Sequence, residues 1–159
     1  MNSFGAWAFP LAMAAGMAVT LQTTLNGQLS KGLSGDPVAA AIFSFMIGLV
    51  TLIVVGLMRG NTLSLLADIP AQPAWVLLGG VMGAFALLSN VILVPRIGMA
   101  ALVGLVIAGQ LLSSLAIDHF ALLGSAHRPV SAIKFLGALL MLGGLAISLF
   151  GDRWFRMLA

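Results

Sequence analysis

Hydrophobic and polar positions follow one another in long blocks along this chain: five apolar stretches are separated by short polar gaps. Every charged residue lies in a gap or at the end of a stretch, except Lys134 near the start of the fifth. A helix needs about 20 apolar residues to cross a hydrocarbon core about 30 Å thick. The pattern therefore predicts an all-α, polytopic membrane protein, one five-helix domain with spans at about 5–29, 37–58, 74–94, 98–117 and 132–150.

Polar and helix-breaking residues mark the expected ends of these helices. Asp36 is placed to cap the helix 37–58, with Pro37 at its first position, and Gly60 follows its end. The segment Pro95-Arg96-Ile97-Gly98 is so short that the helices on either side of it must form an antiparallel hairpin. Residues 151–159 place basic side chains beside Trp154 and Phe155, which predicts a short interfacial tail in contact with membrane lipid.

Composition agrees with a membrane protein and narrows the partners. Hydrophobic residues make up 61% of the chain and charged residues 7%, against about 25% charge in a soluble domain. The net charge of +3 is a thin excess without an aromatic, basic patch, so nucleic acid is not an expected partner. The chain has no cysteine, which excludes disulfides and thiolate chemistry. We expect no cofactor and no bound metal.

The first apolar stretch could be mistaken for a signal peptide. Such peptides have a basic start and an apolar region of about 7–15 residues. Here no Lys or Arg precedes Lys31, and the apolar run is longer than that. We therefore expect a retained helix.

The basic residues are divided almost equally between the two sides of the membrane. Five spans put the N-terminus and the gaps near 59–73 and 118–131 on one side. That side carries three basic residues and the other carries four; they are Arg59, Arg128 and Lys134, against Lys31, Arg96, Arg153 and Arg156. This near balance favours insertion in both orientations and an antiparallel dimer. The alternative is that Arg153 and Arg156 fix a single topology.

Amide and acidic side chains within the apolar stretches are the candidate site residues. Gln22 and Asn26 are four residues apart and share a helix face, which indicates a polar cavity wall or solvation near the helix end. Gln110, Ser114 and Asp118 form a second polar stripe, from the centre of a span to its end. Asp118 stands where the helix dipole disfavours a carboxylate, so it is either a paired site residue or a solvated loop residue.

Two further candidates come from the helix 74–94 and the hairpin after it. Asn90 shares a face with Gly79 and Gly83, whose spacing permits close helix packing. Ser44 and Gly48 on the helix 37–58 form another seam for contacts between helices or subunits. Arg96 either extends to lipid phosphates or attracts an anionic substrate group at the mouth of a cavity.

Several classes of chemistry have little support in the sequence. The chain contains no glutamate and no aspartate in the middle of a span, which weakens a simple cation/proton antiporter. No serine lies in a G-x-S-x-G turn and no H-E-x-x-H is present. We therefore do not expect an enzyme.

The ordered set of motifs resembles the small five-helix bacterial family of the YdcZ type, placed in the drug/metabolite transporter superfamily. The resemblance covers almost the whole chain and rests on Gln22-x-x-x-Asn26, Ser44-Phe45-x-x-Gly48, Trp75-x-x-Leu78-Gly79-Gly80-x-x-Gly83-Ala84, Pro95-Arg96-x-Gly98, Ala108-Gly109-Gln110-Leu111 and Asp118-His119-Phe120. It implies a bacterial inner-membrane protein that acts as half of a ten-helix transporter with inverted halves. The chain lacks the first-helix glutamate of the four-helix multidrug exporters, so their coupling mechanism is not carried over.

These observations predict a secondary-transporter subunit that moves a small metabolite or drug-like solute as an antiparallel homodimer or with a paralogous subunit. The predicted substrate-binding residues are Gln22, Asn26, Asn90, Arg96, Gln110, Ser114 and Asp118. Two alternatives remain open: a passive channel for a small solute or ion, and an accessory subunit of a larger membrane complex.

Overall fold

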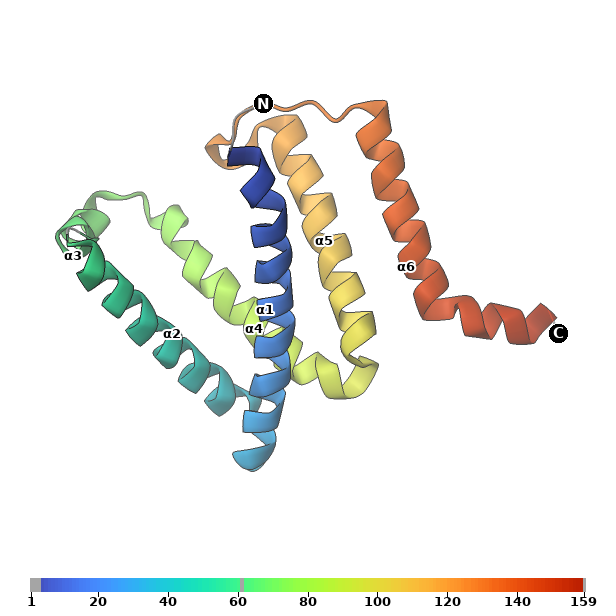
Figure 1. Cartoon of the computed structure of the whole chain (residues 1–159), viewed down its shortest axis with the longest axis horizontal. Coiled ribbons are helices and arrows are strands. Elements are labelled where there is room, and N and C mark those ends of the chain that lie inside the picture. The colour runs from blue at the N-terminus through green and yellow to red at the C-terminus, as the bar shows by residue number, and fades with distance from the viewer. Residues whose placement is uncertain (1–3, 61, 159) are drawn as a thin grey trace. The chain divides into compact units, whose positions relative to one another are not determined.

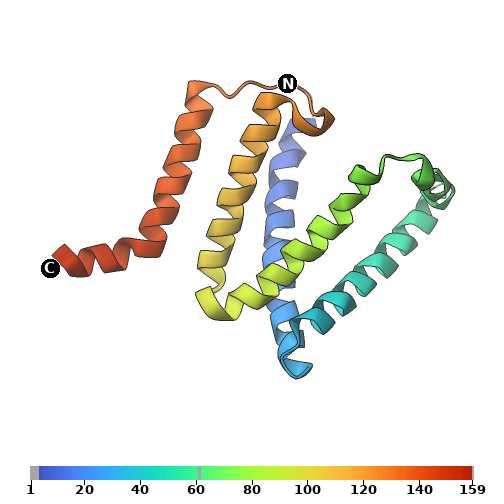
Figure 2. The same ribbon diagram turned by 180° about the vertical axis from the view of Figure 1, so that it is seen from behind.

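Five long helices dominate the structure, a computed structural model that describes residues 4–60 and 62–158. They are α1 (Phe4–Gly32), α2 (Pro37–Arg59), α4 (Leu78–Ile97), α5 (Met99–Phe120) and α6 (Ala132–Leu158), as Figures 1 and 2 show. Each helix provides all or most of a segment that is long and apolar enough to cross a membrane. These segments are Trp7–Gly32, Pro37–Arg59, Ala74–Ile97, Met99–Phe120 and Ala132–Asp152. The described residues contain no strand. The all-α prediction with five spans is therefore confirmed.

Short helical turns fill the longest connections. Between α2 and α4 lie α3 (Thr62–Leu65) and the 3₁₀ turns η1 (Leu66–Ala71) and η2 (Ala74–Leu77). A third 3₁₀ turn, η3 (Leu122–Gly124), follows α5. Pro73 stands before η2, where its fixed φ of −57° suits the start of a turn.

The start of α2 has the expected cap. The Asp36 carboxylate accepts hydrogen bonds from the backbone N–H groups of Val38 and Ala39, at 2.8 and 3.3 Å, and Pro37 occupies the first turn. These bonds satisfy two of the N–H groups that a helix start leaves free. At the other end, Gly60 has a φ of 87°, a conformation that favours glycine, and follows the last residue of α2.

Several helix ends differ from the sequence-based expectation; α6, for example, runs on to Leu158 rather than ending near residue 150. Lys31 was expected in the loop but lies in the last turn of α1, which ends at Gly32, because a cation is favourable at the negative end of a helix. Pro95 and Arg96 likewise belong to α4, and the break falls at Gly98, whose φ is 82° and ψ is 158°. A side chain would strain this backbone conformation, so glycine sets the position of the break.

The chain divides into two compact units, Met1–Arg96 and Ile97–Ala159. In the first unit, α1 packs on α2. Helices α2 and α4 meet in a small apolar cluster of Ala41, Leu87 and Val91. In the second unit α5 packs on α6. That the whole chain forms one domain stays a prediction.

Glycine allows the closest contact between α5 and α6. A Cβ added at Gly104 would overlap with Leu145 Cδ1 on α6. The expected glycine seam on α4 makes looser contacts: Gly83 has only Phe45 Cζ nearby, at 3.9 Å from a built Cβ, and Gly79 has nothing within 4 Å. The close contact in the second unit falls at Gly104, a glycine that the sequence analysis did not single out.

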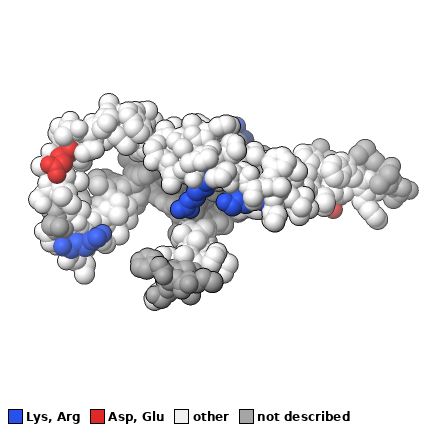
Figure 3. Space-filling view, turned by 90° about the horizontal axis from the view of Figure 1, so that it is seen from above, with Lys and Arg blue, Asp and Glu red and all other residues white. Residues whose placement is uncertain are grey.

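Most of the helix surface is apolar and exposed, as a membrane protein requires. Only 6–11% of the residues in the most apolar window of each span are buried against the rest of the chain. Figure 3 shows one face, where Lys, Arg, Asp and Glu cover only a few small patches of a mostly uncharged surface. The exposed surface must therefore be covered by lipid or by other helices.

Candidate functional site

A groove of about 440 Å³ lies between α1 and α2 in the first unit. Figures 1 and 2 show these two helices diverging from the turn that joins them. Helix α1 contributes Gln22, Leu25, Asn26 and Leu29, and helix α2 contributes Phe43, Ser44, Ile47 and Gly48. The structure thus places two predicted site residues, Gln22 and Asn26, in one groove.

The polar residues of the two walls lie at matching depths from the shared turn. Asn26 precedes the end of α1 at Gly32 by six residues and Ser44 follows Pro37 by seven, which corresponds to about 9 and about 10 Å of helix. Gln22 and Gly48 lie one turn further, on the same faces as Asn26 and Ser44. Ser44 therefore stands on the wall opposite Asn26, and the room beside Gly48 lies at the level of Gln22.

Asn26 is the most informative side chain in this groove. It is only 5% exposed, and its Nδ2 atom is buried without a hydrogen-bond partner in the described part of the chain. Leaving a buried amide unpaired costs about 1–3 kcal/mol. The Asn26 amide is therefore a polar group of the groove lining that the described part of the chain leaves unsatisfied.

Hydroxyl groups elsewhere on these helices are satisfied within their own helix. Thr20, Thr24 and Thr51 donate to the carbonyl four residues earlier, at 2.9–3.2 Å. Buried Thr23 does the same to Val19. The half-buried hydroxyl of Ser44 has no hydrogen bond to any described residue. It is a second polar group facing the groove with unused hydrogen-bonding capacity.

The other predicted residues of the first unit lie outside this groove. Asn90 is half-buried on α4, beside the Leu87 and Val91 contacts with α2. Arg96 is exposed in the last turn of α4. No ion pair joins Arg96 to another residue that the structure describes.

The predicted stripe in the second unit does not line either of two grooves found there. Gln110 and Ser114 are exposed on α5, and the Ser114 hydroxyl donates to the Leu111 carbonyl at 2.8 Å. Asp118 is half-buried, and its backbone carbonyl accepts from Arg128 N–H at 2.8 Å. How these three residues stand relative to Gln22 and Asn26 stays a prediction.

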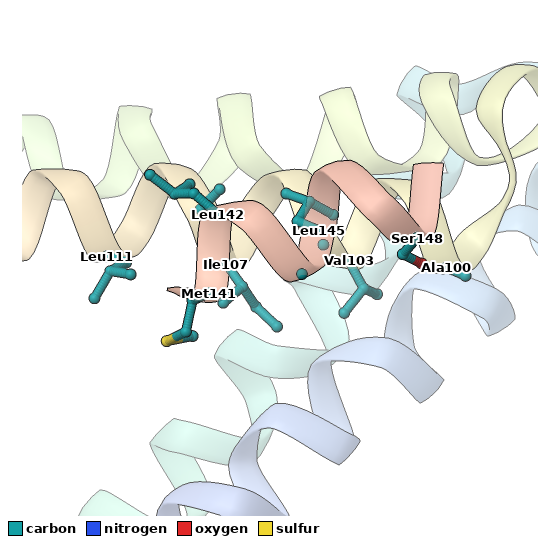
Figure 4. Close-up of a pocket in the computed structure, with 11 residues that line it drawn as sticks. Ala100, Val103, Ile107, Leu111, Met141, Leu142, Leu145 and Ser148 are labelled. Atoms are coloured by element: carbon teal, nitrogen blue, oxygen red, sulfur yellow. The ribbon is translucent and has the colours of Figure 1, made fainter. Parts of the chain in front are cut away.

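The two grooves of the second unit are mostly apolar. Figure 4 shows the one of about 340 Å³ between α5 and α6, where Ser148 supplies the only side-chain hydroxyl among the lining residues. The other, of about 470 Å³, lies near His119, whose Nδ1 accepts the Val130 N–H at 3.3 Å. Among the described residues, no three His, Asp, Glu or Cys side chains gather as metal ligands would.

Comparison with known proteins decides the family. Residues 7–147 match the family model described as "Putative inner membrane exporter, YdcZ". The chain belongs to the YdcZ family. No match was found among curated proteins or among solved structures.

Membership in the YdcZ family, together with the five possible spans, places the chain in the inner membrane as a multi-pass protein. It also gives the chain a transporter role, because the family description is that of an exporter rather than an enzyme. The resemblance inferred from the sequence is therefore confirmed.

Sequence reasoning had treated Ser44 as part of a packing seam and missed its place in the groove. The sequence did contain one indication that Ser44 faces Asn26: the two residues lie about equally far from the turn that connects their helices.

Proposed function

We propose that this YdcZ-family chain is a subunit of a secondary transporter that moves a small metabolite or drug-like solute across the inner membrane. The α1–α2 groove supplies part of the solute pathway, with Gln22 and Asn26 as binding residues. The observation that carries the proposal is the buried, unpaired Asn26 amide in a groove between two spans. Polar groups within a membrane are costly and commonly mark a substrate pathway.

The remaining predicted residues complete the proposed site. Asn90 and Gln110 would extend the polar wall, Ser114 and Asp118 would continue it toward one end, and Arg96 would stand nearer the other. Alternating access would expose this site to each side in turn. The assignment of these five residues is supported by their positions in the spans alone.

We propose further that two chains associate in opposite orientations, as a homodimer or with a paralogous subunit. The near-equal division of basic residues supports this arrangement. The groove also supports a second subunit. Its described lining comes from α1 and α2 alone, so the open side of the groove is left for another helix to cover. A second subunit would supply helices of inverted orientation there.

The transport proposal predicts saturable solute flux by the purified full chain in liposomes. A panel of radiolabelled neutral, anionic and cationic metabolites is tested for uptake and for counterflow against the same solute loaded inside. At least one solute should show both saturation and counterflow, with protein-free liposomes as the control. Electrical current without exchange would instead indicate a channel. No flux, together with a stable heteromer in mild detergent, would indicate an accessory subunit.

The dual-orientation proposal predicts that a C-terminal tag is accessible from both faces of the inner membrane. Two populations of comparable size should be labelled, one in intact spheroplasts and one only after permeabilisation. A periplasmic tag and a cytoplasmic tag on proteins of known single topology serve as controls. A tag found on one face only would contradict dual orientation and would leave Arg153 and Arg156 as the residues that fix the topology.

A further inference from the structure

We propose that the α1–α2 groove binds an uncharged part of the solute, in which a hydrogen-bond acceptor such as an amide or ketone carbonyl stands beside an apolar group. This inference rests on the proposed transport function and specifies the class of substrate. It assigns Ser44 as a further binding residue, opposite Asn26.

The groove offers no counter-charge to an ionic ligand. None of its eight lining residues carries an ionisable side chain. A charged group that left water for this site would lose its hydration without an ion pair to replace it, and the cost is large at low dielectric. The lining therefore selects against charge at this position of the solute.

The polar groups of the groove favour an acceptor. The Asn26 Nδ2 atom can only donate, and it is buried without a partner in the described structure. The Ser44 hydroxyl stands at a similar depth on the facing wall and is likewise unpaired there. A carbonyl oxygen has two lone pairs and can accept from both groups at once. One such oxygen would relieve the unsatisfied amide and use the free hydroxyl.

The apolar part of the solute is expected beside these donors. Leu25 and Leu29 on α1 and Phe43 and Ile47 on α2 form most of the remaining lining. A built Cβ at Gly48 has nothing within 4 Å, so the groove is open at that level. A volume of about 440 Å³ lies in the range of small-molecule sites.

The absence of native cysteine makes this groove directly measurable, because a single introduced thiol reports on its own surroundings. In the full chain, Ser44→Cys is treated with three methanethiosulfonates of similar size: uncharged hydroxyethyl, anionic sulfonatoethyl and cationic trimethylammonioethyl. Ser34→Cys in the exposed turn gives the reactivity in water. Thr51→Cys, two turns beyond Ser44 on the same helix, exposed and outside the groove lining, gives the reactivity of α2 beyond the groove.

At Ser44→Cys, the uncharged reagent should react at least tenfold faster than either charged reagent, after normalisation to Ser34→Cys, and faster than at Thr51→Cys. Equal reactivity of all three reagents, preference for a charged one, or no reaction at all would overturn the proposal. Gly48→Cys repeats the measurement one turn away if Ser44→Cys does not fold, since the structure has room for a side chain there.

Protection from labelling tests the acceptor. Benzamide, which joins an apolar ring to a carbonyl, should slow labelling at Gly48→Cys, where Ser44 is intact, at least threefold, and this protection should disappear when Asn26→Leu is added. Benzoate, its charged match, should not protect. Protection by benzoate equal to that by benzamide, protection that survives Asn26→Leu, or no protection by benzamide would overturn the assignment.

The outcomes separate this inference from the transport proposal. Transport of a charged solute that Asn26→Leu leaves unchanged would keep the transporter and remove the groove as the site of recognition. Selective labelling and protection without flux of any solute would keep the groove as a binding site and remove the transporter.

Discussion

Asn26→Leu is expected to lower saturable transport about two- to tenfold while leaving the protein as stable as the parent or more stable. The reason is that the Asn26 amide is buried without a partner in the described chain and, under the proposed function, gains one from the solute. A neutral hydrogen bond is worth about 0.5–1.5 kcal/mol, and 1.4 kcal/mol corresponds to a tenfold change in an equilibrium constant. Loss of the bond should therefore weaken binding by that order.

The stability of the same variant should move in the opposite direction. Leucine has the same branched arrangement of side-chain heavy atoms as asparagine, and the replacement removes a buried polar atom that has no partner in the described chain. The two measurements are initial rates of counterflow in liposomes and unfolding by SDS in mixed micelles. Gln28→Leu is the matched control, because Gln28 is an exposed amide of the same helix that does not line the groove. Reduced stability with unchanged transport would show that Asn26 has a packing role.

Gly104→Leu is expected to destabilise the packing of α5 on α6 by about 1–3 kcal/mol, the usual cost of inserting a larger side chain into a close contact. Even a Cβ at this position overlaps with Leu145 Cδ1, and a whole leucine side chain cannot be accommodated without moving α6. Gly104→Ala should cost less, because the overlapping atom is the end of a side chain that can rotate.

The effect of Gly104 is checked by SDS unfolding of the full chain with two comparisons. Gly109→Leu lies on the same helix, where a built Cβ has nothing within 4 Å, and should change stability little. Adding Leu145→Ala to Gly104→Ala should recover part of the loss, since the two residues are in direct contact and their effects are not additive. If Gly104→Leu and Gly109→Leu behaved alike, the close contact at Gly104 would not be a determinant of packing.

The spans could be predicted from the sequence because their cause is local. Hydrocarbon length and the cost of a charge in lipid act on each segment separately, so the apolar blocks give the helices directly. Local chemistry also predicted the α2 cap, where Asp36 reaches the N–H groups of Val38 and Ala39. The end of α1 was placed too early, because Lys31 ends an apolar run without ending the helix.

The partner of each helix face could not be predicted in the same way. In a soluble helix the apolar face identifies the core, but here lipid-facing and protein-facing surfaces are both apolar. Glycines at 79 and 83 had the spacing of a packing motif, yet the close contact of the second unit falls at Gly104, where the partner Leu145 comes from another helix.

The candidate site was predictable only in part. Gln22 and Asn26 were identified because they are polar side chains within an apolar span and share one helix face. Ser44 resembles Thr51 in the sequence, and only the structure shows that the Thr51 hydroxyl is bonded to its own helix while that of Ser44 is not. Whether Asn90, Arg96, Gln110, Ser114 and Asp118 join the same site stays a prediction.

The small buried fraction of each span, 6–11% of its most apolar window, makes the surrounding medium part of the energetics of this protein. Acyl chains of the wrong length leave apolar helix surface in contact with headgroups or water, at a cost of fractions of a kcal/mol per ångström of thickness mismatch. Melting temperatures measured in a short-chain detergent will therefore differ from those in a native lipid bilayer, and rankings of variants are comparable only within one amphiphile.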